Sequence, residues 1–313
     1  MLLREVMDVF ELIDCPEASK ERIETYLKQI DPCLDFHGEI IRKADNTTDF
    51  IRIVITGESH SRKSQTRPTL GIVGRLGGVG ARPERLGAVS DADGAITVLA
   101  AALKLVRMKM RGDVLRGDVI FTTHICPSAP TGSQNDPPQS AGMRCPVDPA
   151  TLRRLEVDER MDAILSVNAT KRNEIINHNG FSISPTVKQG YILSVSRDLL
   201  RIMTRVTGRL PVTFPIKTAD ITPPDNGLPH INSIMQPSTV TACPVVGVAT
   251  TTEQPGAGSG TGANFPLELE STARFLVEVA KEFGNGSCRF YDEQEFERLL
   301  ELYGSMERLQ TVP

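Results

Sequence analysis

The sequence contains no tryptophan, and aromatic residues make up only 5% of its 313 residues. Proteins that bind single-stranded nucleic acid usually stack bases on aromatic side chains, so a platform of that kind is not expected. Basic residues are not in excess either, because 35 lysines and arginines stand against 39 acids and the formal net charge is −4. Nucleic-acid-binding domains typically carry a basic face. The composition therefore argues against a nucleic-acid partner.

Long apolar runs are also missing. No run approaches the roughly 18 residues that a membrane-spanning helix needs. The first segment, from Met1 to Asp14, carries acids inside its apolar pattern, whereas a signal peptide has an uninterrupted apolar core. The six cysteines are scattered and form no CxxC pair, which is typical of reduced thiols rather than a disulfide framework. We therefore expect a cytoplasmic protein with no membrane partner.

Short apolar runs alternate with helical patterns along the chain. Buried strands are expected at Leu70–Val73, Val119–Thr123, Ile164–Val167 and Val245–Ala249, after two β-like runs at Gly38–Ile41 and Phe50–Ile55. Apolar residues at helical spacing predict helices at Leu3–Asp14, Arg22–Ile30, Asp93–Met110, Leu199–Thr207, Leu267–Phe283 and Asp292–Tyr303. This alternation is typical of an α/β protein with three layers, in which helices flank a mixed, mostly parallel central sheet. We expect one such domain over residues 1–313.

In open α/β sheets, ligands bind beyond the carboxyl ends of the strands, so the residues that follow each apolar run are candidates for a site. They include Arg75, the segment Ser90–Gly94, His124, Asn168 and Asn264. Two long loops also follow predicted strands. Residues 127–149 hold six prolines and two glycines, and the glycine-rich loop at 254–264 contains a GxGxxA string. That string fits either an anion cradle or a flexible loop.

The order of these segments resembles that of the clan of di-zinc aminopeptidases and carboxypeptidases. The resemblance covers most of the chain and includes the opening helix and the corner at Cys15–Ser19. It implies a zinc-exopeptidase-like three-layer fold, here without an evident lid domain, and a homo-oligomer is possible by analogy with the clan. The chain is also similar to an uncharacterised bacterial family that is known only as a domain of unknown function.

The resemblance implies a metal site, yet most of the aligned ligands are replaced. The clan places a His-x-Asp after the first central strand, where this chain has Arg75 followed by leucine and glycine. Asp91 matches the bridging aspartate. Ile125 aligns with the general base of the clan. Asn168 aligns with one of its aspartate ligands, and Asn264 aligns with its last histidine ligand. Since zinc is bound by His, Asp, Glu or Cys, and Ile125 takes no proton from a metal-bound water, a two-zinc peptidase mechanism is not expected.

Two hypotheses follow from different classes. The first is a degenerate protein of the peptidase fold, a pseudoenzyme without zinc, that binds a small amino-acid-like or peptide ligand. Its ligand-binding residues would be Arg75, Asp91, Asp93, His124, Asn168 and Asn264. The second is a metal-dependent hydrolase of amide or peptide bonds, with a rebuilt zinc or manganese site. Its metal ligands would be Asp91, His124 and Cys126.

Each candidate also has an ordinary structural interpretation. The acids Asp91 and Asp93 suit a helix N-terminus, with Ser90 or Asp91 as the cap. His124 and Cys126 alternate on a strand end, where a buried thiol and a hydrogen-bonded histidine would be unremarkable. A nucleophilic Cys126 with His124 as its base is a further alternative, although neighbouring same-face positions rarely give the required geometry. The position of His230 relative to the site is left open.

Arg75 stands where the first zinc ligand of the clan would be, and its guanidinium cannot lose its proton. An arginine binds a carboxylate with two parallel hydrogen bonds. We therefore predict an ion pair between Arg75 and Asp91. In the alternative, Arg75 points outward and holds the carboxylate or phosphate of a ligand.

Overall fold

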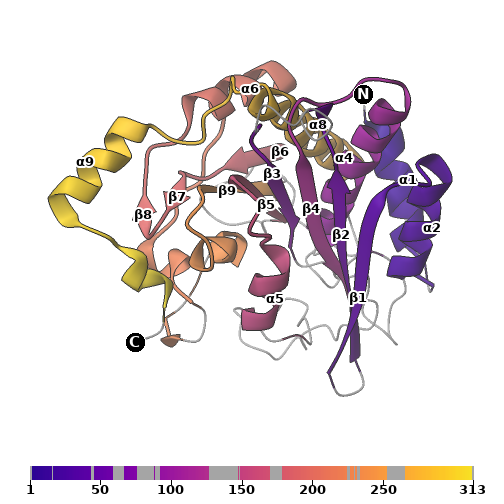
Figure 1. Cartoon of the computed structure of the whole chain (residues 1–313), viewed down its shortest axis with the longest axis horizontal. Helices are drawn as coiled ribbons and strands as arrows, with labels where there is room; N and C mark the ends of the chain where they lie inside the picture. The colour runs from indigo at the N-terminus through magenta and orange to yellow at the C-terminus, as the bar shows by residue number, and fades with distance from the viewer. Residues whose placement is uncertain are drawn as a thin grey trace.

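A nine-stranded mixed sheet runs through the part of the chain that the structure, a computed structural model, describes (Figure 1). Its order is β1-β2-β4-β3-β5-β9-β7-β8, and β6 pairs with β9 off this path. The strands are β1 (Asp35–Lys43), β2 (Asn46–Ile55), β3 (Leu70–Gly74), β4 (Val119–Ile125), β5 (Ala163–Ala169), β6 (Gly180–Ile183), β7 (Val187–Lys188), β8 (Tyr191–Ile192) and β9 (Val245–Thr251). The described residues are 2–15, 17–43, 46–58, 67–75, 88, 92–126, 147, 149–169, 178–223, 226–228, 230, 233–251 and 265–311.

The four central strands β4, β3, β5 and β9 are parallel to one another. They contain the four apolar runs that predict buried strands, and almost every residue in them is buried, as expected for strands covered on both faces. β1 and β2 form an antiparallel hairpin that joins the sheet through β4, and β6, β7 and β8 run antiparallel at the other end. The prediction of a mixed sheet with a parallel centre is confirmed.

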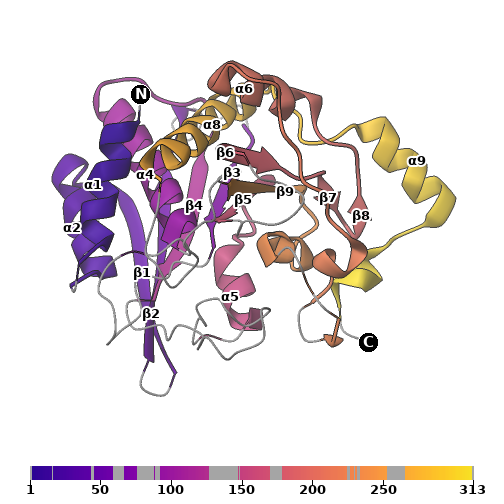
Figure 2. The ribbon, with the colours of Figure 1, turned by 180° about the vertical axis from the view of Figure 1, so that it is seen from behind.

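Helices cover both faces of the sheet (Figures 1 and 2). One face, which we call the long-helix face, carries α1 (Leu3–Ile13), α2 (Lys20–Ile30), α4 (Asp93–Met110), α6 (Arg197–Thr207) and α8 (Pro266–Gly284). The other, the short-helix face, carries α5 (Pro149–Glu156) and the 3-10 helices η3 (Thr218–Ile221) and η5 (Ser233–Thr239). η6 (Glu307–Gln310) packs on η5. These helices and the sheet make the predicted three-layer α/β architecture.

Side chains alternate between the two faces along each central strand. On β3, Ile72 packs into the core of the long-helix face and Val73 into that of the short-helix face. α4 lies so close to the sheet that a Cβ on its second residue, Gly94, would stand 2.5 Å from the carbonyl oxygen of Arg75. Glycine at this position therefore lets the start of α4 approach the ends of β3 and β5.

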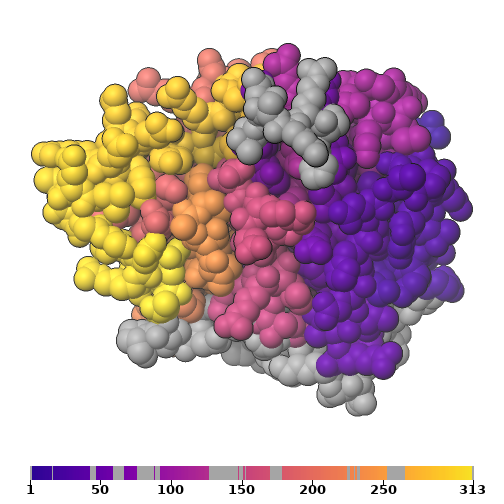
Figure 3. Space-filling view, viewed as in Figure 1, coloured from indigo at the N-terminus to yellow at the C-terminus, as the bar shows by residue number. Residues whose placement is uncertain are grey.

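The predicted helices are confirmed to within a few residues at each end. α9 (Glu293–Tyr303) lies at the opposite end of the molecule from α1 and α2 (Figures 1 and 3). Within the described ranges, no helix combines the length and apolar character needed to cross a bilayer. The sequence reasoning missed α5, the short strands β6 to β8 and the 3-10 helices. The loops at 127–149 and 254–264 lie almost wholly outside the described ranges.

Candidate functional site

Three residues predicted for the site stand side by side at the carboxyl edge of the sheet. The backbone N–H of Arg75 donates to the carbonyl of Val167 at 2.9 Å, so the pairing of β3 with β5 continues to Arg75. Counting along the strands, Arg75, His124 and Asn168 all belong to the short-helix face. Neighbouring strands are about 4.8 Å apart, so His124 on β4 and Asn168 on β5 flank Arg75. We call these three residues the sheet-edge row; each is buried.

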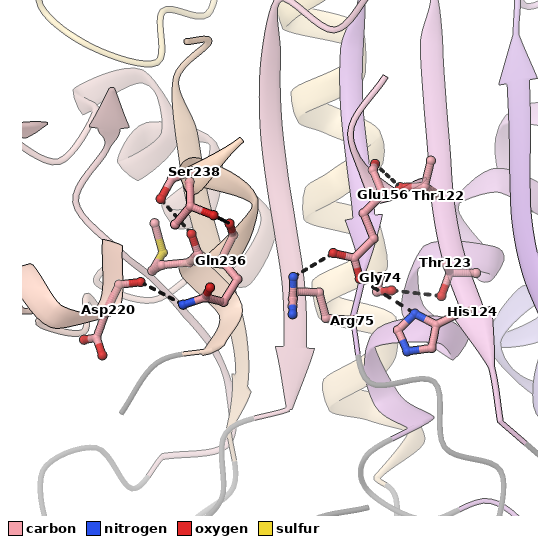
Figure 4. A network of polar contacts seen from close by, with 11 residues as sticks. Gly74, Arg75, Thr122, Thr123, His124, Glu156, Asp220, Gln236 and Ser238 are labelled. Carbon is pink, nitrogen blue, oxygen red and sulfur yellow. Dashed lines mark hydrogen bonds and ion pairs between the residues drawn. The ribbon is translucent and has the colours of Figure 1, made fainter. Parts of the chain in front are cut away.

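Glu156, the last residue of α5, forms a buried cluster with Arg75 and His124 of this row (Figure 4). Its Oε2 lies 2.7 Å from Nη1 of Arg75, and its Oε1 lies 3.7 Å from Nδ1 of His124. The backbone carbonyl of Glu156 accepts a 2.7 Å hydrogen bond from Oγ1 of Thr122, which lies on β4 two residues before His124. The Glu156 side chain has no exposed area, so its charge depends on protein groups for compensation.

The turn after α5 is held by a second set of charges. Asp158 contacts Arg52 of β2 at 3.2 Å and Arg160 at 2.7 Å. The hydrogen bonds from Arg160, helped by the charge of Arg52, lower the pKa of Asp158 to about 2. Because Asp158 follows Glu156 by two residues, these contacts fix the end of α5 against the sheet.

Several buried polar atoms on the short-helix face have no hydrogen-bond partner among the described residues. They are Nε of Arg75, Nδ1 and Nε2 of His124, Oε1 of Glu156 and Oγ of Ser166. Ser166 lies on β5, two residues before Asn168, and so on the same face. Buried polar atoms in proteins are normally hydrogen-bonded. A concentration of such atoms at one edge of the sheet is what a polar ligand would satisfy.

A glutamine that the sequence reasoning missed faces this row from η5. Nε2 of Gln236 lies 3.4 Å and 3.3 Å from the backbone carbonyl oxygens of Asp220 and Thr222, and 3.2 Å from Nδ1 of His230. η5 packs against α5, β5 and β9, which places it on the short-helix face. In Figure 4 the amide of Gln236 lies between Asp220 and Arg75. No sequence periodicity pointed to Gln236, because it lies in a 3-10 helix that contains a proline.

The acids predicted at the start of α4 are only partly described. Asp93 lies in the first turn of α4 and is buried. The N-cap residue is Ala92, which offers no capping side chain, so the expectation of Ser90 or Asp91 at the N-cap is wrong. Ser90 and Asp91 themselves lie outside the described residues, as does Asn264. The ion pair of Arg75 with Asp91 therefore stays a prediction, and the carboxylate that the structure places on Arg75 is that of Glu156.

The structural interpretation of Cys126 and His124, a buried thiol beside a hydrogen-bonded histidine, holds only in part. Cys126 is a buried cysteine whose Sγ lies 3.4 Å from Oγ1 of Thr48. His124 is buried too, but among the described residues it makes no hydrogen bond, so the expectation of a hydrogen-bonded histidine is wrong. Its ring instead faces the Glu156 carboxylate at ion-pair distance.

The donors in the described ranges do not fit the two-zinc site of the clan. No three His, Cys, Asp or Glu residues there are grouped to hold a metal ion. His124 and Glu156 are near one another, but Arg75 bonds directly to Glu156. A guanidinium that never loses its proton repels a dication and competes with it for the carboxylate. These residues are arranged for a salt bridge.

Comparisons with known proteins agree with the fold. Residues 39–313 match the model of a family described as "Protein of unknown function (DUF1177)". No curated protein matches the sequence. The fold is similar to that of the bottromycin maturation enzyme BotP in complex with Mn, with a TM-score of 0.51 at 14% identity over 90% of this chain and 70% of that one. It is also similar to the LapA aminopeptidase of Legionella pneumophila, with a TM-score of 0.50 at 9% identity over 91% of this chain and 72% of that one.

A third solved structure, the cytosol aminopeptidase from Coxiella burnetii, has a TM-score of 0.49 at 12% identity over 90% of this chain and 68% of that one. At identities this low, the likeness to BotP and LapA shows the fold alone. The expectation of a peptidase-like α/β fold is confirmed.

Proposed function

The chain belongs to the DUF1177 family, and we propose that it is a peptidase-fold protein that binds a small amino-acid-like or peptide ligand at its sheet edge without a two-zinc centre. The observation that carries this proposal is the buried pair of Arg75 and Glu156 beside His124. A zinc exopeptidase offers carboxylates and imidazoles to metal ions at this edge. Here the same edge offers one fixed positive charge and one carboxylate.

Arg75 supports recognition of a ligand carboxylate. Glu156 occupies Nη1 of the guanidinium, while the buried Nε has no partner among the described residues. An arginine presents five N–H donors in a planar fork, so one edge can hold Glu156 while another donates to a second carboxylate. Such a ligand carboxylate would lie at the carboxyl edge of β3, next to His124 and Asn168.

Glu156 and His124 support recognition of a ligand amino group. Oε2 of Glu156 bonds to Arg75, but Oε1 makes no hydrogen bond within the described part of the chain. An ammonium group would supply donors both to Oε1 and to an unprotonated nitrogen of His124. A zwitterion therefore complements the cluster at both charges and keeps it neutral overall. This matching favours an amino acid or a short peptide over a simple anion.

The second candidate function is a metal-dependent amide or peptide hydrolase with ligands at Asp91, His124 and Cys126. The observation that favours it is that His124 and Cys126 are both buried and, by strand alternation, belong to the same face. Two observations weigh against it: Cys126 contacts Thr48, and His124 faces the carboxylate that Arg75 binds. Zinc or manganese would be the metal in this case.

Calorimetric titration combined with metal analysis separates the two functions. The probes are L-alanine, L-alanyl-L-alanine, propionate and ethylamine, titrated into protein whose zinc and manganese contents have been measured. We expect the two zwitterions to bind at least tenfold more tightly than propionate or ethylamine, in protein holding less than about one metal ion per chain. Stoichiometric zinc or manganese that is lost in His124→Ala, together with hydrolysis of the dipeptide, would establish the hydrolase instead.

A further inference from the structure

The orientation of the Gln236 amide is fixed by its neighbours. The side chain is 4% exposed, and its Nε2 faces the carbonyl oxygens of Asp220 and Thr222. Those oxygens only accept hydrogen bonds, so the atom that faces them is the NH2 group. The amide oxygen Oε1 therefore points elsewhere, and it has no hydrogen-bond partner among the described residues.

The same amide fixes the tautomer of His230. Nδ1 of His230 lies 3.2 Å from Nε2 of Gln236, and because an amide nitrogen donates but does not accept, Nδ1 is the unprotonated ring nitrogen. The proton of the neutral ring is therefore on Nε2. That nitrogen is also buried and unpartnered within the described residues. Within the described part of the chain, Gln236 and His230 together present one acceptor and one donor that have no partner.

We infer that Gln236 and His230 form a second recognition element, which selects a neutral amide group on the ligand of the sheet edge. The inference rests on the proposed function and names the ligand class: an amino-acid zwitterion that carries a carboxamide or a peptide bond. An amide supplies an N–H for Oε1 of Gln236 and a carbonyl oxygen for Nε2 of His230. A carboxylate in the same place would set oxygen against the oxygen of Gln236.

The position of η5 brings this element to the same ligand. η5 packs on α5, whose last residue is Glu156, and on β5, which carries Ser166 and Asn168. In the view of Figure 4, Gln236 lies on the Arg75 side of the cluster, and Glu156 and His124 lie beyond Arg75. A ligand held by its charges at Arg75 and Glu156 would extend its amide toward η5.

Matched pairs of ligands test the inference on the wild-type protein by calorimetry. The pairs are glutamine with glutamate, asparagine with aspartate, and glycylglycine with the analogue whose peptide N–H is replaced by an ester oxygen. The first member of at least one pair should bind about tenfold more tightly, as expected for one hydrogen bond in a buried site. In Gln236→Met that ratio should fall to about one.

Gln310→Met is the matched control, because Gln310 also donates its Nε2 to two backbone carbonyls, those of Ser238 and Thr241, but lies in η6. It should keep the wild-type ratio. If alanine binds and the wild type shows no amide preference in any pair, the inference fails and the proposed function stands. If no probe binds, the proposed function fails and the inference falls with it. The ligand pairs need no variant, so a folding defect in Gln236→Met would not decide the outcome.

Discussion

The guanidinium of Arg75 lies 2.7 Å from the carboxylate of Glu156, although 81 positions separate the two residues in the sequence. Arg75 follows the end of β3, and Glu156 is the last residue of α5. Both side chains are almost wholly buried, so water compensates neither charge. Each residue therefore depends on the other, and the pair joins α5 to the edge of the sheet.

This dependence predicts a strong asymmetry between single and double variants. Arg75→Ala leaves the Glu156 carboxylate buried without its cation and should lower the free energy of unfolding by about 3–5 kcal/mol. The double variant Arg75→Leu with Glu156→Gln removes both charges and should recover most of that loss. Urea unfolding followed by circular dichroism measures all of these free energies.

A surface ion pair provides the control for that cycle. Arg205 and Glu282 pair on the long-helix face, where Arg205 is largely exposed, so Arg205→Ala should cost at most about 1 kcal/mol. Equal and additive losses at Arg75 and Glu156 would contradict the buried pair.

Asp158 predicts a defined dependence of stability on pH. Hydrogen bonds from Arg160 lower its pKa from 3.8 to about 2 in the folded protein. A carboxyl with a lowered folded pKa contributes stability above its unfolded pKa, and this contribution is lost as the pH falls through the folded value. Asp158→Asn should therefore destabilise the protein at pH 7, and the difference from wild type should shrink between about pH 4 and pH 2. Urea midpoints across this range check it; a difference that stays constant down to pH 2 would show that charge is not the cause.

The thiols predict a labelling order. Burial raises the pKa of Cys288 to about 12, whereas Cys33 is exposed. Because the thiolate is the reactive form, iodoacetamide at pH 8 should modify Cys33 first and reach Cys288 only when the protein unfolds. Peptide mass spectrometry of native and urea-treated protein measures both rates. Labelling of Cys288 at the rate of Cys33 in the native protein would contradict the burial of Cys288 in the core of the long-helix face.

Much of the architecture was predictable because its signals are local. The apolar runs of β3 and β5 are continuous, and the carboxyl-edge rule named Arg75, His124 and Asn168 as candidates. The strand registers of the structure then bring these three residues into one row. Glu156 was not predictable, because α5 is a short polar helix whose burial depends on contacts with β4 and η5 that no local pattern encodes. Gln236 was missed for the same reason: its role comes from carbonyls and a ring brought together by the fold.

The most direct test of the proposed site is calorimetric titration of L-alanyl-L-alanine into the Arg75→Leu, Glu156→Gln double variant. The control is the surface double variant Arg205→Gln, Glu282→Gln. Both proteins are first shown to unfold cooperatively, with urea midpoints close to that of the wild type. Binding should be lost in the first and retained at wild-type affinity in the second, because only the first removes the charges that hold the zwitterion. Wild-type affinity in the Arg75→Leu, Glu156→Gln protein would contradict a ligand site built on this pair.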